Sequence, residues 1–134
     1  MPRYATRLGR DPAATYRQID VVGRTAEADP HRLVELLYDE LIHALRTAAW
    51  ATEHRQGKVK GDKITRATAI LFALEAGLDF EAGGGVAETL ARLYQGARRA
   101  VVDASVGWDP APFVDVAANL EDIAEAWRSL RAAG

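Results

Sequence analysis

Apolar residues crowd one stretch near the start of the chain, which reads DPHRLVELLYDELIHAL at positions 29–45. Asp29 suits the N-cap of a helix, and Pro30 suits the first helical position, where a missing N–H costs nothing. The apolar positions that follow cover far more of a helix than the single stripe of an ordinary surface helix; they are Leu33, Val34, Leu36, Leu37, Tyr38, Leu41, Ile42 and Leu45. We therefore expect this helix to bury two sides, either at the centre of its own bundle or partly against a partner.

Three further segments repeat apolar residues in steps of three and four, the spacing of a helix with one buried face. The positions are Ile64, Ala67, Leu71, Leu74 and Leu78 in the first, Val86, Leu90, Leu93, Ala97, Val101 and Ala104 in the second, and Phe113, Val116, Leu120, Ile123, Trp127 and Leu130 in the third. Breaks are predicted at the segment Gly57 to Gly61 and at the triplet Gly83 to Gly85, because glycines terminate helices. The pattern predicts helices over 30–55, 62–80, 86–106 and 110–131.

An N-terminal segment, 12–24, is ambiguous, because Arg17, Ile19 and Val21 alternate as in a strand, whereas Tyr16, Ile19 and Val22 fit a helical turn. We predict a short helix here. Long helices joined by short connections pack as antiparallel neighbours. The predicted fold is therefore all-α: an antiparallel up-and-down four-helix bundle in a single domain over 1–134. Residues 29–131 form the bundle, and 1–28 form a mobile N-terminal arm with a short accessory helix.

Composition narrows the function mainly by exclusion. The absence of cysteine removes disulfides and thiolate metal sites, and is compatible with the cytoplasm. No apolar run is long enough to cross a membrane or to act as a secretion signal, so we expect a soluble cytoplasmic protein without membrane insertion. A net charge of -2 gives no footprint for nucleic acid. The arginines of the N-terminal arm are more typical of a solvated tail than of a binding site; they are Arg3, Arg7, Arg10, Arg17 and Arg24.

One pair of residues has the spacing of metal ligands. Glu40 and His43 form a Glu-x-x-His step, which di-iron bundles use, but those bundles need a second such step and two more glutamates. The surroundings of His43 also faintly resemble a phosphorylatable histidine, although Thr47 stands where a glycine is usual. A structural or half-exposed histidine is the favoured interpretation, and a metal or phosphotransfer bundle centred on His43 is kept as an alternative.

Other candidate sites fail on their context. No strand precedes the glycine triplet and no Lys-Ser or Lys-Thr follows it, so a phosphate-binding loop is not expected. Paired carboxylates such as Asp79 and Glu81 have no evident pocket around them. We predict that the protein is not an enzyme and needs no cofactor or metal.

Residues from all five segments form a series of short motifs along the chain. They are Tyr16, Gln18 and Val21; Pro30, Leu33, Val34, Leu37, Tyr38 and Asp39; Gly77-Leu78-Asp79, Gly83-Gly84, Val86-Ala87, Leu90, Leu93-Tyr94 and Arg98-Arg99; and Leu120, Ile123, Glu125, Ala126 and Trp127. Taken together, they resemble the flagellin export chaperone family, the FliS type, over most of the chain. The chain departs from the family pattern at Gly85, where an acidic residue is usual, and at Gln95-Gly96, where an acid and an aromatic residue are usual.

This resemblance implies a cytoplasmic chaperone without enzymatic activity, which binds the disordered C-terminal region of flagellin as helices in apolar grooves. It would prevent premature polymerisation, keep flagellin competent for type III export, and contact the flagellar export gate when cargo is bound. Candidate contacts are Leu37, Tyr38, Leu41, Leu90 and Tyr94, about half of which we expect to be core. Tyr16, Ile19 and Val21 would cover the groove in the free protein. A monomer or weak homodimer is expected, and a helical adaptor for another partner is the alternative.

Overall fold

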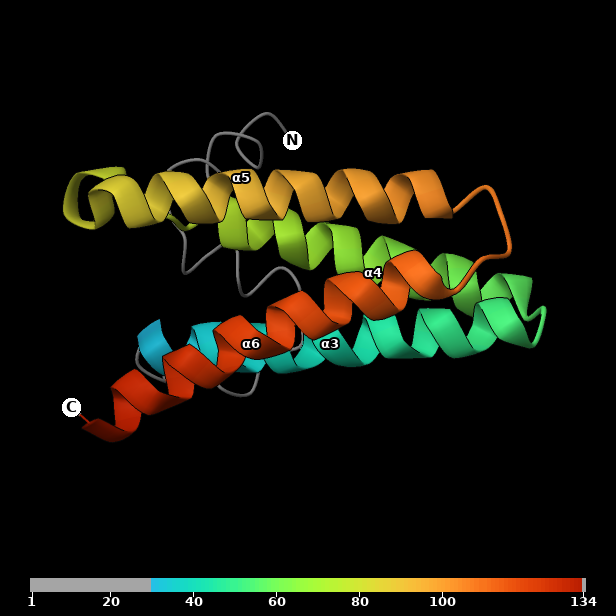
Figure 1. The fold of residues 1–134 in the computed structure, drawn as a ribbon, viewed down its shortest axis with the longest axis horizontal. Helices are drawn as coiled ribbons and strands as arrows, with labels where there is room; N and C mark the ends of the chain where they lie inside the picture. The colour runs from blue at the N-terminus through green and yellow to red at the C-terminus, as the bar shows by residue number, and fades with distance from the viewer. Residues whose placement is uncertain (1–29, 134) are drawn as a thin grey trace, which may run out of the picture.

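The computed structural model describes residues 30–133 and consists there of four helices with no strand (Figure 1). They are α3 (Pro30–Glu53), α4 (Gly57–Ala76), α5 (Phe80–Ala104) and α6 (Ala111–Ala133). Successive helices run in opposite directions, α3 packs on α4 and α6, and α5 packs on the same two helices (Figure 1). The predicted all-helical bundle is confirmed. Asp29 and the predicted short helix over 12–24 lie outside the described residues.

Helix α3 supplies the largest share of the core. Its buried apolar residues spread over the faces that meet α4 and α6; they are Leu33, Leu37, Tyr38, Leu41, Ile42, Ala44, Leu45, Ala48, Ala49 and Ala51. The expectation that this helix buries two sides is confirmed. Most of the apolar surface of α3 is therefore buried within the bundle itself. A surface that binds a partner is then expected at the ends of α3 and on the neighbouring helices.

The turn from α3 to α4 is tighter than predicted, and it overturns the predicted break at Gly57 to Gly61. Arg55 adopts the left-handed conformation with φ of 56°. The N–H of Gln56 then donates to the Ala51 carbonyl at 2.8 Å, and that of Arg55 donates to the Thr52 carbonyl at 3.3 Å, which is the Schellman pattern. Because this turn alone reverses the chain, α4 begins at Gly57 and includes both glycines.

The glycine triplet also lies inside a helix rather than between two. Asp79 caps α5 by accepting a hydrogen bond from the Ala82 N–H at 3.0 Å, so the helix begins at Phe80 instead of at 86. Gly84, with φ of 50° and ψ of -125°, then kinks the helix after its first turn. That backbone conformation is open essentially to glycine alone. The predicted interruption of regular helix is therefore present as a kink, while the connection itself is only 77–79.

Lys60 anchors the connection between α5 and α6 to α4. Its side chain is buried, and its ammonium group donates to the Ser105 carbonyl at 3.1 Å and to the Gly107 carbonyl. The same nitrogen lies 4.3 Å from the centre of the Trp108 ring. Carbonyl oxygens at the end of a helix and an aromatic face both favour a cation, so the charge of Lys60 is compensated without a carboxylate.

Glu75 joins α4 to α5 at the other end of that helix pair. Its carboxylate accepts hydrogen bonds from Gln95 Nε2 at 2.6 Å and from Arg98 Nη1 at 2.8 Å. Burial by itself raises the pKa of the Glu75 carboxyl group, but these hydrogen bonds and the charge of Arg98 outweigh it and leave the pKa below its ordinary value. The carboxylate is thus held in its charged form.

Candidate functional site

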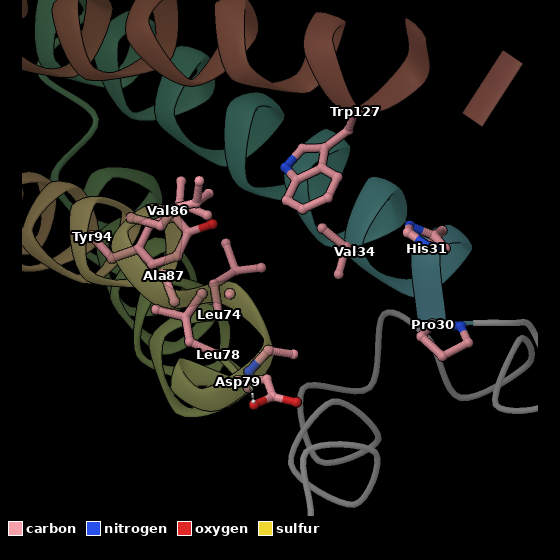
Figure 2. Close-up of a pocket in the computed structure, with 14 residues that line it drawn as sticks. Pro30, His31, Val34, Leu74, Leu78, Asp79, Val86, Ala87, Tyr94 and Trp127 are labelled. Atoms are coloured by element: carbon pink, nitrogen blue, oxygen red, sulfur yellow. Dashed lines mark hydrogen bonds between the residues drawn. The ribbon is translucent and has the colours of Figure 1, made fainter. Parts of the chain in front are cut away.

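An open pocket of about 590 Å³ lies at the end of the bundle where α3 and α5 begin and α6 ends (Figure 2). Most of its lining is apolar. The lining residues are Pro30, His31 and Val34 from α3, Leu74 from α4, Gly77, Leu78 and Asp79 from the connection, Ala82, Gly83, Val86, Ala87, Leu90 and Tyr94 from α5, and Trp127 from α6. An apolar concavity of this size that opens to solvent is typical of a site for an apolar ligand or helix.

The kink in α5 shapes this pocket. Ala82 and Gly83 in the first turn, and Val86 and Ala87 after the kink, all line it, so the two halves of α5 approach it from different directions. Gly83 has no room for a side chain, because a Cβ atom there would lie 2.9 Å from that of Ala87. Val86 is 68% exposed and forms an apolar lip.

Tyr94 forms part of the inner wall, and Tyr38 lies behind it in the core. The hydroxyl groups of Tyr38 and Tyr94 are joined by a hydrogen bond of 2.5 Å, and the rings meet edge to face with centres 6.3 Å apart. This bond connects α3 to α5 across the bundle. Burial raises the pKa of the Tyr38 hydroxyl above its ordinary value, and the proximity of Tyr94 and Trp127 offsets part of that effect. The Tyr38 phenol is therefore neutral at physiological pH.

The predicted contact residues divide between core and pocket. Leu37, Tyr38 and Leu41 are all 0% exposed and belong to the core in this structure. Leu90 is half-buried and lines the pocket, and Tyr94 lines it with its ring almost wholly covered. Tyr16, Ile19 and Val21 lie outside the described residues.

Several pocket residues were not among the predicted contacts, namely His31, Val34, Leu78, Val86 and Trp127. Each except His31 was already recognised as part of an apolar helical stripe. The pocket forms where the apolar faces of three helices extend beyond the packed core. Periodicity identifies these faces, but it does not show how the helix ends lie relative to one another, so it cannot predict the pocket. The exposed Val86 beside a glycine triplet is the one local signal of this arrangement.

A second, smaller groove of about 470 Å³ lies between α5 and α6. Its floor includes Gly96, Ala97 and Ala100, small residues that let another helix approach closely. Arg92 lines one side and Asp115 the other, so the two sides carry opposite charge. Gly96 is one of the positions where the chain departs from the family pattern, and it contributes to the open floor of this groove.

Among the described residues, His43 has no neighbours that would complete a metal site. Its side chain is exposed, and Glu40 forms an ion pair with Arg66 on α4, with 3.6 Å between Oε2 and Nε. Within residues 30–133, no group of three or more histidine, aspartate or glutamate side chains is placed to hold a metal ion. Nor is any described helix long and apolar enough to cross a membrane.

Comparison with known proteins places this chain in a family. The model of the family described as "Flagellar protein FliS" matches residues 12–134. A flagellar secretion chaperone FliS of Salmonella typhimurium is 34% identical over 116 residues, which is 86% of each chain. A flagellar secretion chaperone FliSB of Pseudomonas aeruginosa is 33% identical over 84% of this chain and 89% of its own length. A FliS of Vibrio cholerae is 28% identical over 88% and 87%, respectively. The chain belongs to the FliS family of flagellar proteins.

Proposed function

We propose that the protein is a cytoplasmic export chaperone that binds the disordered C-terminal region of flagellin as helices. The observation that carries the proposal is the open apolar pocket between α3, α5 and α6 in a chain of this family. An amphipathic helix buries its apolar face in such a cavity, in the manner of other helix-in-groove complexes. The α5–α6 groove offers a place for a second helix of the same region.

This mode of binding suits a chaperone that must later release its cargo. Flagellin segments that pack inside the filament are apolar on one face, and covering that face prevents premature polymerisation. A disordered region that folds on binding spends part of its interaction energy on ordering, so a large contact area does not imply irreversible binding. The loaded protein would then deliver flagellin to the flagellar export gate.

Within this proposal the predicted contact residues have two roles. Leu90 and Tyr94 touch the bound helix, since both line the pocket. Leu37, Tyr38 and Leu41 lie in the core behind it and hold the pocket wall in position. Tyr16, Ile19 and Val21 cover the pocket before cargo arrives.

A titration tests the proposal directly. We expect a peptide of the flagellin C-terminal region to bind with a dissociation constant below about 100 μM, or about -5.5 kcal/mol, in isothermal calorimetry. Val86→Asp puts a charge on the apolar lip and should weaken binding by at least about tenfold, because the carboxylate must be desolvated against the bound helix.

Val106→Asp is the matched control, since this valine is also exposed but lies outside the pocket lining, in the turn after α5. Its affinity for the peptide should equal that of the unmodified protein. Absence of binding at 100 μM would refute the chaperone proposal, and equal losses in the two variants would move the binding site away from this pocket.

A further inference from the structure

A buried hydrogen-bond donor stands at the edge of the pocket without an acceptor. The Nε1 atom of Trp127 is shielded from solvent and makes no hydrogen bond within the described part of the chain. Buried donors are almost always paired, because leaving one unpaired costs the desolvation of that group. The rest of the Trp127 side chain is partly exposed and lines the pocket.

The surroundings of the indole aim this donor toward the inner wall. In Figure 2 its nitrogen lies on the side of the ring that faces Tyr94, and the N–H is near enough to the Tyr38 hydroxyl to lower its pKa. It does not reach hydrogen-bond geometry with that hydroxyl. His31 is on another side of the indole, with ring centres 6.4 Å apart and a tilt of 57°. In the complex proposed below, the indole turns so that this N–H faces the pocket.

The charges around the pocket select the kind of acceptor. Among residues 30–133, no lysine or arginine lines the pocket, and the one carboxylate in its lining belongs to Asp79. A second carboxylate in this apolar site would be desolvated without a lysine or arginine and would face the charge of Asp79. The backbone carbonyls inside a bound helix are already hydrogen-bonded. Neutral side-chain oxygens remain. Serine and threonine hydroxyls on a helix tend to bond back to its own carbonyls, whereas the amide carbonyl of asparagine or glutamine is free to accept from a neighbour.

We propose that Trp127 is a specificity residue. Its indole N–H donates a hydrogen bond to a single asparagine or glutamine within the apolar face of the helix that occupies the pocket. This inference rests on the proposed function, since the helix is taken to belong to the flagellin C-terminal region. The amide accepts the indole N–H and so satisfies the donor that residues 30–133 leave unpaired. An entirely apolar helix leaves it unpaired and binds more weakly.

Nuclear magnetic resonance of the ¹⁵N-labelled full chain tests this contact, because only three tryptophans give indole signals. The Trp127 signal is assigned by its loss in Trp127→Phe, or by elimination with Trp50→Phe and Trp108→Phe if that variant does not fold. Addition of the flagellin peptide should move the Trp127 indole proton downfield and slow its exchange with solvent. An indole proton that neither shifts nor gains protection on saturation with peptide overturns the inference.

Calorimetry with paired variants adds an energetic test. Trp127→Phe keeps an aromatic ring but removes the donor, and should weaken peptide binding by about threefold to tenfold, the worth of one net hydrogen bond. Trp50→Phe, on the exposed side of α3 and outside the pocket lining, should not change the affinity.

A scan of the peptide, in which each asparagine or glutamine is replaced by leucine, should identify one position whose replacement weakens binding to the unmodified protein but not to Trp127→Phe. Replacing that position by glutamate should weaken binding further. If the unmodified protein binds and no position couples to Trp127, the inference is wrong and the proposed function stands. If the unmodified protein does not bind the peptide, both are refuted.

Discussion

At the scale of single residues, Lys60 shows how one buried charge determines a connection. Its ammonium group bonds two backbone carbonyls and lies over Trp108. Removing the charge while keeping the aliphatic stem leaves these carbonyls without their donor. We predict that Lys60→Met lowers the free energy of unfolding by about 1–3 kcal/mol, measured by urea denaturation at neutral pH.

Lys58→Met provides the comparison within the same helix turn, because the Lys58 side chain is 88% exposed and its one ion-pair partner within residues 30–133 is the exposed Asp62. Exposed pairs of this kind contribute about 0–1 kcal/mol, so this variant should remain close to the unmodified protein. Equal stability of the two variants would show that the contacts of Lys60 contribute no more than a surface ion pair.

Residue positions also mark where sequence reasoning stops. The apolar stripe of α3 correctly predicts burial on two sides, but it cannot assign Leu37 or Leu41 to the bundle rather than to a partner, since both alternatives have the same periodicity. That assignment depends on which helices lie opposite, a long-range property. Trp127 illustrates the same limit. Its helical spacing predicts that the ring is buried, but not that Nε1 has no hydrogen-bond acceptor within the described residues.

At the scale of elements, the four bundle helices are predictable because each carries a clear apolar face, whereas two of their starts are not. Glycine is compatible with a helix, a kink or a turn, so its presence alone does not locate a boundary. Helix α4 includes Gly57 and Gly61 because the left-handed Arg55 has already turned the chain. Helix α5 includes the triplet because Asp79 caps it earlier.

Adjacent glycines in that triplet should respond oppositely to the same substitution. Gly84 has φ of 50° and ψ of -125°, so Gly84→Ala should destabilise the protein by about 1–3 kcal/mol through backbone strain. Gly85 has open space around its Cα and no positive φ, so Gly85→Ala should stabilise the helix by about 0.4–1 kcal/mol. Urea denaturation of both variants measures the difference. The kink would be dispensable if both substitutions raised stability.

At the scale of the whole molecule, the bundle separates a well-packed centre from an open end. The core of α3 contacts α4 and α6 along its length, while the pocket lies at the end where α3 and α5 begin and α6 ends. An open apolar pocket is an aggregation hazard for a free protein. In the sequence, five residues separate 12–24 from Pro30, and Pro30 lines the pocket. This short connection is why we propose that the segment around Tyr16, Ile19 and Val21 covers the pocket until cargo displaces it.

Hydrogen exchange of the full chain, free and saturated with the flagellin peptide, decides whether such a cover exists. If cargo displaces it, amides over 12–24 should exchange faster in the complex, while those over 86–94 should exchange more slowly because the peptide covers them. Amides over 41–49 serve as an internal control, since they lie in the packed part of α3 and should not change. Unchanged exchange over 12–24, together with protection over 86–94, would mean that the pocket stands open in the free protein. Binding would then require no displacement of an internal competitor, and the affinity for cargo would be unaffected by deleting the N-terminal segment.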